Sequence, residues 1–367
     1  MGLRCWDGFH FPVLPFDDPP VPEMLVIVLG MLRAVATPLS RLIFAGLCAI
    51  SLLVVSTPSE ASGTLSLTTL QQQILAGTTN NAAGTVLPSV KNVMKGPAWT
   101  FVGNTLVTPA CNPRQTPSLI SRPKPCSFGS SKAPKTVVLV GASHAGMWMP
   151  AFKSMASTDF YQFKAFIYAG CPPLLTDFTV APFDRDGKYV TAQDCATWNE
   201  NVADAVNALH PYAVIVAGGS QSMTAQSGVL AEWVRGMTQF MNRFSATKKI
   251  IIGSTPVLNI STEMAKCIDS NPTHLTTCNT TYNSASNTDI TSLLLARDTQ
   301  VAAATGARLV PIMSLVCTPT SDSKPMATCP AVVNHKLVYV DDNHLTAVYV
   351  TYVTPVFRSL INIALKG

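Results

Sequence analysis

The sequence predicts an α/β fold, a three-layer sandwich with a central parallel sheet, and a small disulfide-stapled N-terminal extension. Short apolar runs typical of buried strands alternate with longer segments typical of amphipathic helices. The 367 residues are enough for one large domain and a smaller appendage. Strands are expected at 136–141, 163–168, 213–217, 249–253 and 308–312, and helices at 146–156, 192–209, 227–244 and 289–304.

The first element is a leader over residues 1–61. Residues 42–55 form an uncharged apolar run after Arg33 and Arg41, and small residues stand at the −3 and −1 positions of a cleavage site after Ala61. Because the run is short for a membrane span, it predicts a secretory signal peptide. An uncleaved N-terminal anchor is the alternative. The expected location is therefore secreted or in the cell envelope, and at a membrane only if the leader stays in place.

The start of the leader is acidic, which does not suit a signal peptide, so Met24 and Met31 are alternative translation starts. Residues 1–61 carry three Arg and five acidic residues, and the rest of the chain carries 22 basic and 15 acidic residues, a net charge of +7. The basic residues are scattered, with no run of five. This pattern does not predict a nucleic-acid partner.

Residues 62–133 are rich in Thr, Ser, Asn and Pro, and we expect an extension packed on the main domain. A helix is expected near Leu70–Leu75 and a strand near Trp99–Val107. The even number of cysteines after the leader predicts disulfides. The sequence contains no Cys-x-x-Cys motif, which argues against a zinc site. Pairing of neighbours along the chain is the simplest of 105 arrangements. The eight are Cys111, Cys126, Cys171, Cys195, Cys267, Cys278, Cys317 and Cys329.

Residues 134–367 are expected to form the main domain. Its last segment, 346–363, is ambiguous, because a β-branched run favours a strand whereas the later Leu and Ile spacing favours a helix. Pro355 would disturb either structure.

Two segments far apart in the sequence predict a catalytic site. The strand at 136–141 leads into Ser143, at the strand end where parallel sheets carry their sites. Near the end of the chain, Asp341 and His344 are spaced as Asp-x-x-His. A histidine can take the serine proton while an aspartate holds the imidazole in the required tautomer, so the pattern indicates a serine esterase.

These motifs resemble the SGNH (GDSL-like) hydrolase superfamily, with its flavodoxin-like sandwich. They are most similar to the SGNH domain fused to, or partnering, membrane sugar O-acyltransferases. That group's first block reads Gly-Asp-Ser-His-Ala, often followed by Trp and Pro. The resemblance covers roughly residues 64–365. The matching residues are Gly141, Ser143, His144, Ala145, Trp148 and Pro150, with Cys126-Ser-Phe-Gly, Gly170-Cys171-Pro-Pro and Cys195-Ala-Thr-Trp198 elsewhere.

The resemblance implies that Ser143 is the nucleophile, His344 the general base and then acid, and Asp341 the residue that orients His344. Asp342 is a poorer candidate for orienting the imidazole. His144 either lines the pocket or caps the helix start. The oxyanion hole would use the backbone N–H of the nucleophile and donors at Gly170, Gly219 and Gln221.

The expected function is that of an exported serine esterase or O-acyltransferase. It would act through an acyl-enzyme on acyl esters of cell-envelope glycans, and acetyl is the expected acyl group. Ala142 stands where the family has Asp, which motivates an alternative: a catalytically degenerate SGNH-fold protein that binds glycan or an acyltransferase partner. A disulfide-stapled structural envelope protein is the third possibility.

The expected substrate is an acylated glycan or a small ester, and no metal or organic cofactor is expected. The membrane half of fused relatives is not found in this sequence. A separate membrane acyltransferase is therefore an expected partner, unless the chain is a free-standing esterase.

Overall fold

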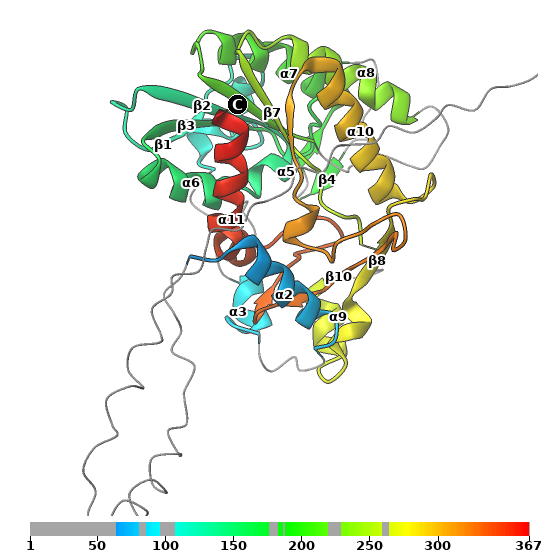
Figure 1. Ribbon diagram of the computed structural model, residues 1–367. Helices are drawn as coiled ribbons and strands as arrows, with labels where there is room; N and C mark the ends of the chain where they lie inside the picture. The colour runs from blue at the N-terminus through cyan, green and yellow to red at the C-terminus, as the bar shows by residue number, and fades with distance from the viewer. Residues whose placement is uncertain are drawn as a thin grey trace, which may run out of the picture. The chain divides into compact units, whose positions relative to one another are not determined.

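A six-stranded sheet lies at the centre of the computed structural model (Figure 1). Its order is β1-β3-β2-β6-β7-β9, all parallel except β1, which pairs antiparallel with β3. The structure describes residues 64–80, 86–95, 107–175, 183–185, 188–218, 229–258 and 264–366. The strands are β1 (Cys126–Phe128), β2 (Lys135–Gly141), β3 (Tyr161–Ile167), β6 (Ala213–Ala217), β7 (Lys248–Ile252) and β9 (Arg308–Val310).

Helices cover both faces of the sheet. Successive side chains of a strand point to opposite faces, so each strand contributes to a core on either side. Val137 and Leu139 of β2 join the core on the face of α6 and α11. Val138 and Val140 join the core on the face of α7, α8 and α10. The predicted three-layer α/β sandwich is confirmed. The helices are α6 (Met149–Thr158), α7 (Ala192–Asn207), α8 (Val229–Asn242), α10 (Ile290–Thr305) and α11 (Ala347–Lys366).

The predicted strands and helices of the sandwich form close to their expected bounds, with one division. The segment expected as one helix at 146–156 is two helices, α5 (Ser143–Gly146) and then α6. Pro150 lies in the first turn of α6, where its missing N–H would have no helical partner in any case. The proline therefore starts a new helix.

The ambiguous last segment is a helix, α11, with Pro355 inside it. Packing decides the outcome, since residues along its length, from Tyr349 to Leu365, are buried in the core. Trp148 stacks on Phe357 with ring centroids 4.1 Å apart. Among the described helices, α11 is long and apolar enough to cross a membrane, but half of its most apolar stretch is buried within the fold. We therefore interpret it as a core helix.

The extension contributes to the same compact unit, residues 64–367. Helix α2 (Leu67–Gly77) includes the expected helix at 70–75, and its Leu70 and Ile74 are fully buried. The Gln71 side chain donates a hydrogen bond to the Ser314 carbonyl. The strand expected at 99–107 lies almost wholly outside the described residues. β1 joins the central sheet although it precedes residue 134, because its backbone pairs with the free edge of β3.

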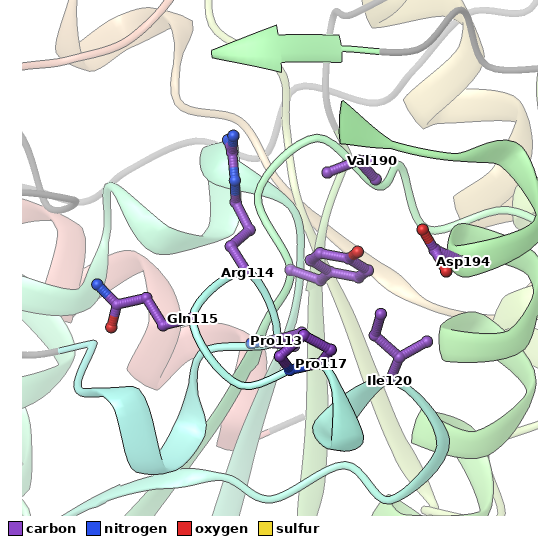
Figure 2. A pocket seen from close by; sticks show the side chains of 8 residues that line it. Pro113, Arg114, Gln115, Pro117, Ile120, Val190 and Asp194 are labelled. Atoms are coloured by element: carbon purple, nitrogen blue, oxygen red, sulfur yellow. The ribbon is translucent and has the colours of Figure 1, made fainter. Parts of the chain in front are cut away.

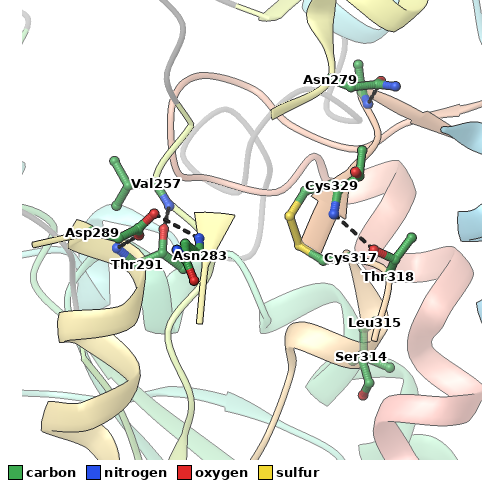
Figure 3. The surroundings of a disulfide bond; sticks show 12 residues. Val257, Asn279, Asn283, Asp289, Thr291, Ser314, Leu315, Cys317, Thr318 and Cys329 are labelled. Carbon is green, nitrogen blue, oxygen red and sulfur yellow. Dashed lines mark hydrogen bonds between the residues drawn. A yellow bond between two sulfur atoms is a disulfide. The ribbon is translucent and has the colours of Figure 1, made fainter. Parts of the chain in front are cut away.

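Four disulfides pair the eight cysteines of the described residues, each with its next neighbour along the chain, which is the simplest of the arrangements that the sequence left open. Figure 3 shows the surroundings of Cys317–Cys329, where the neighbouring Thr318 and Thr328 exchange hydrogen bonds. Each bridge closes a short loop, so these cysteines are structural and hold no zinc. The pairs are Cys111–Cys126, Cys171–Cys195, Cys267–Cys278 and Cys317–Cys329.

The other described elements are short and form antiparallel pairs or single turns. β8 pairs with β10, β11 with β12, and β4 with β5. In Figure 1, α9, β8 and β10 lie near α2 and α3. These elements are α3 (Val90–Lys95), η3 (Pro109–Cys111), α4 (Ser118–Ser121), β4 (Phe183–Arg185), β5 (Lys188–Val190), α9 (Met264–Ser270), η4 (Leu275–Cys278), β8 (Thr280–Asn283), η5 (Met313–Leu315), β10 (Met326–Cys329), β11 (Val332–Val333) and β12 (Lys336–Leu337).

Candidate active site

Ser143 is the first residue of α5, on the sharp turn that follows β2. Gly141, which ends β2, has a φ of +152°, and a Cβ there would lie 2.6 Å from the carbonyl oxygen of Ala217 in β6. Only glycine permits so close an approach of the two strands. Ala142 is extended and buried, and the helix begins immediately after it. The turn therefore places Ser143 at the carboxyl edge of the sheet.

The second half of the site is the loop 339–345 between β12 and α11. One carboxylate oxygen of Asp341 accepts the backbone N–H groups of Asn343, at 3.1 Å, and of His344, at 2.8 Å. This local turn brings the side chains of Asp341 and His344 together. The hydroxyl of Thr255, which follows β7, donates to the Asn343 carbonyl at 2.6 Å and so attaches the loop to the sheet edge.

The two halves meet in a chain of hydrogen bonds. His344 Nε2 lies 2.8 Å from Ser143 Oγ, and His344 Nδ1 lies 2.9 Å and 3.0 Å from the two oxygens of Asp341. An ionised carboxylate can only accept, so Nδ1 carries the proton and the neutral imidazole accepts the serine O–H at Nε2. Ser143 and His344 are only 6% and 8% exposed, which limits competition from water.

Asp341 is held as a carboxylate by its neighbours. Burial alone would raise its pKa. The side-chain hydrogen bond and charge of His344, together with the backbone N–H groups of Asn343 and His344, lower the pKa by more than burial raises it. The net result is a pKa below the ordinary value of an aspartate. The carboxylate is therefore suited to hold an imidazole and to stabilise its cation.

The His144 ring packs against the ring of His344. The two ring centroids are 4.4 Å apart. Burial lowers the pKa of His144 well below 6.5, and the charges of His344 and Arg297 lower it further, against the opposing effects of Asp341 and the Asn343 backbone. His144 is therefore neutral. Of the two roles predicted for His144, the structure favours lining the pocket, since its imidazole packs on His344.

A buried ion pair supports the neighbouring strand ends, and the sequence did not indicate it. Arg297 and Asp298 of α10 are fully buried and bonded to each other at 2.7 Å. The guanidinium also donates to Ser254 Oγ at 2.7 Å, and Asp298 accepts the Ser254 N–H at 2.7 Å. A Cβ at Gly218 would lie 2.6 Å from Arg297. The pair therefore fixes the backbone just after β6 and β7.

The remaining predicted site residues are only partly accounted for. Gly170 is buried in the turn after β3, with a φ of +94° that favours glycine. Gly219 and Gln221 lie outside the described residues. Asp341 is the aspartate hydrogen-bonded to His344 Nδ1, whereas Asp342 is exposed and its carbonyl accepts the Leu258 N–H at 2.7 Å.

The chemistry that this arrangement allows is proton transfer from a serine hydroxyl to an imidazole. A carboxylate behind the imidazole stabilises the positive charge that then forms. In the described part of the chain, no three His, Cys, Asp or Glu side chains gather in a group that could hold a metal ion.

The fold and the site together define an α/β protein with the Ser–His–Asp arrangement of serine hydrolases. The family model described as "SGNH domain (fused to AT3 domains)" matches residues 110–359. The chain belongs to this family.

Two solved structures are similar to the chain. The first is the periplasmic domain of a Salmonella ser. Paratyphi A lipopolysaccharide acetyltransferase. It is 15% identical, with 78% of this chain and 100% of that chain covered and a TM-score of 0.49. The second is a Corynascus thermopiles (Myceliophthora fergusii) carbohydrate esterase family 2 enzyme with a carbohydrate binding domain. It is 14% identical, with 65% and 69% covered and a TM-score of 0.32. No curated protein sequence matches this chain.

Proposed function

We propose that this chain is an exported serine esterase or O-acyltransferase that acts on acyl esters of cell-envelope glycans, with acetyl as the expected acyl group. The observation that carries the proposal is the hydrogen-bonded series Ser143–His344–Asp341. Membership of the SGNH family supports the same reaction class. The three residues would act as nucleophile, general base and orienting residue.

In the first half-reaction, Ser143 Oγ attacks the acyl carbonyl carbon while His344 Nε2 takes the hydroxyl proton. The bond from the carbonyl carbon to the alcohol oxygen then breaks, and His344 returns the proton to that oxygen. The products are acyl-Ser143 and a free alcohol. In the second half-reaction, water or a sugar hydroxyl attacks the acyl-enzyme and gives its proton to His344. Release of Ser143 yields a carboxylic acid or a new ester.

The negative charge on the carbonyl oxygen in each half-reaction needs hydrogen-bond donors. The backbone N–H of Ser143 at the start of α5 and that of Gly170 after β3 are the described candidates, at the carboxyl ends of adjacent strands. One such donor contributes about 3–4 kcal/mol to transition-state stabilisation. Gly219 and Gln221 remain proposed donors from the sequence.

The acceptor decides between hydrolysis and transfer. The family is described as fused to AT3 domains, which supports a separate membrane acyltransferase as the partner that supplies acyl groups. Export through the leader 1–61 would bring residues 62–133 and the SGNH domain 134–367 to the cell envelope. If the leader is uncleaved, it would anchor them at the membrane.

A second candidate function, binding without catalysis, is favoured by one observation. Ala142 replaces the family's usual Asp and makes no side-chain hydrogen bond at the start of α5. A chain that lacks activity would then bind glycan or an acyltransferase partner through the same SGNH fold.

Fluorophosphonate labelling with intact mass as the readout tests the proposal. We expect one adduct on the wild-type chain and none on Ser143→Ala or His344→Ala. Ser127→Ala removes an exposed serine of β1 and should keep the adduct. A well-folded wild type without an adduct would overturn independent catalysis and favour the binding role.

A further inference from the structure

A cavity of about 380 Å³, here called the Tyr168 cavity, lies between the extension and the end of β3. Figure 2 shows the side chains that line it, which come from the segment 113–120, including the start of α4, on one side and from the α7 region on the other. Its volume falls within the range of small-molecule sites. The lining includes Pro113, Arg114, Ile120, Tyr168, Val190 and Asp194.

The Tyr168 cavity lies at the same edge of the sheet as Ser143. β2 and β3 are parallel neighbours, so their carboxyl ends meet at this edge. The backbone N–H of Tyr168 donates to the Gly141 carbonyl at 3.1 Å, two residues before Ser143. Tyr168 also begins the turn that contains Gly170. A ligand in the cavity would therefore contact the turn that carries a candidate oxyanion donor.

Four polar side chains of different kinds line the cavity. Arg114 supplies a cation, Asp194 a carboxylate, Tyr168 a hydroxyl and Gln115 an amide. Burial raises the pKa of Tyr168 to about 12; the charge of Asp194 adds to this rise and that of Arg114 opposes it. The hydroxyl therefore stays protonated, able both to donate and to accept. Opposite charges leave the lining neutral overall.

The other walls are apolar. Pro113, Ile120 and Val190 present carbon atoms to the cavity. A neutral sugar needs this combination, because its hydroxyls both donate and accept while its C–H faces pack on apolar walls. An anion would meet Asp194, and a cation would meet Arg114. The lining therefore selects against a simple ion of either sign.

Two disulfides hold the walls in place. The segment 113–120 lies within the ring closed by Cys111–Cys126. Cys171–Cys195 joins the turn that begins at Tyr168 to the helix that carries Asp194. Walls held in this way lose little conformational entropy when a ligand binds.

We propose that the Tyr168 cavity binds a neutral sugar unit of the glycan whose ester reacts at Ser143. This inference rests on the proposed function, because it assigns a second binding position to the same substrate. The cavity would select the glycan, while Ser143 would act on any ester that reaches it.

Binding of cellotetraose, chitotetraose and mannotetraose to the purified, oxidised chain, measured by calorimetry, tests the inference. We expect at least one of them to bind, about tenfold more weakly to Arg114→Gln, the loss of one charge-assisted hydrogen bond. Tyr168→Phe should weaken binding in the same direction. Arg122→Gln changes an exposed arginine outside the cavity and is the matched control. Asp194 is left unchanged, because it also caps α7.

Hydrolysis of 4-nitrophenyl acetate separates this inference from the proposed function, because that ester has no sugar. The wild type and the control Arg122→Gln, which lies outside the cavity, should hydrolyse it at the same rate. If none of the three sugars binds, or if Arg114→Gln binds them as the wild type does, the inference fails even when 4-nitrophenyl acetate is hydrolysed. If the sugars bind as expected and 4-nitrophenyl acetate is not hydrolysed, the sugar site stands and the proposed catalysis fails.

Discussion

His144 and His344 face each other with their ring centroids 4.4 Å apart and their planes tilted by 33°. Charging both rings would be unfavourable at this distance. Burial already holds His144 neutral, and a charged His344 lowers the pKa of His144 further. We therefore expect that His344 alone takes up a proton during the reaction.

The pH dependence of kcat/KM should carry no contribution from His144. On the acid side we expect a slope no steeper than one proton, because burial lowers the pKa of His144 well below 6.5. His144→Gln should keep that slope, even if it lowers the rate. A two-proton slope in the wild type that becomes one in His144→Gln would contradict the prediction.

His144 should also make the fold less stable at mildly acidic pH. Its folded-state pKa lies below 6.5, so the unfolded chain binds a proton that the folded chain does not. As pH falls below 6.5, the free energy of unfolding should decrease by up to about 1.4 kcal/mol per pH unit from this group. Urea titrations between pH 7 and pH 5 measure the slope, which should be shallower in His144→Gln. The contribution of Asp341 has a separate window, since its lowered pKa makes its stabilisation disappear only below about pH 3.8.

Asp341→Asn should lower kcat by roughly 1,000- to 10,000-fold with little effect on folding. The amide can donate to Nδ1, which would put the imidazole proton on Nε2 and block acceptance of the serine proton. Ester hydrolysis and thermal melting are the measurements. Asp342→Asn is the matched control and should keep its activity. A large loss in Asp342→Asn, with none in Asp341→Asn, would reassign the orienting residue.

Gly141→Ala should destabilise the fold by about 3 kcal/mol or more, since it adds backbone strain and a clash with the Ala217 carbonyl. Gly306→Ala, at the end of α10, is the control. It has a φ of +65° but nothing within 4 Å of the added Cβ, so it should cost only about 1–2 kcal/mol. Chemical denaturation compares the two. Equal costs would show that the close approach of β2 to β6 contributes nothing.

Arg297→Met should destabilise the fold by about 3–5 kcal/mol, because it leaves the Asp298 carboxylate buried without its cation. The double variant Arg297→Met/Asp298→Leu removes both charges and should recover most of the loss. Arg243→Met, in the exposed pair with Asp204, should cost no more than about 1 kcal/mol. A double variant no more stable than Arg297→Met would contradict this interpretation of the pair.

The sequence predicted the parallel strands, the presence of disulfides, with neighbour pairing as the simplest arrangement, and the residues that meet at Ser143. Each has a local signal: an apolar run for β6 or β7, neighbouring cysteines such as Cys267 and Cys278, and a short motif around Ser143 or His344. These features can be predicted because each signal lies within a short stretch of sequence and does not depend on distant partners.

Features set by tertiary packing were not predictable in the same way. The β-branched start of α11 favours a strand locally, and burial against Trp148 and its neighbours overrides that preference. Arg297 and Asp298 resemble an exposed helical charge pair in sequence, and only the fold shows that they are buried. The Tyr168 cavity combines residues from the extension with residues beyond β3, so no single stretch of sequence indicates it.

The nearest-neighbour pattern of the disulfides has a consequence for biogenesis. In a chain that emerges N-terminus first into an oxidising compartment, each cysteine can pair with the next one to appear, without an exchange of partners. Ser143 and His344, in contrast, lie 201 residues apart, and the loop that carries His344 emerges after Cys329, the last of the described cysteines. All four described disulfides could therefore form, step by step along the chain, before the triad does. A chain not yet extended past His344 would be oxidised but would lack its triad.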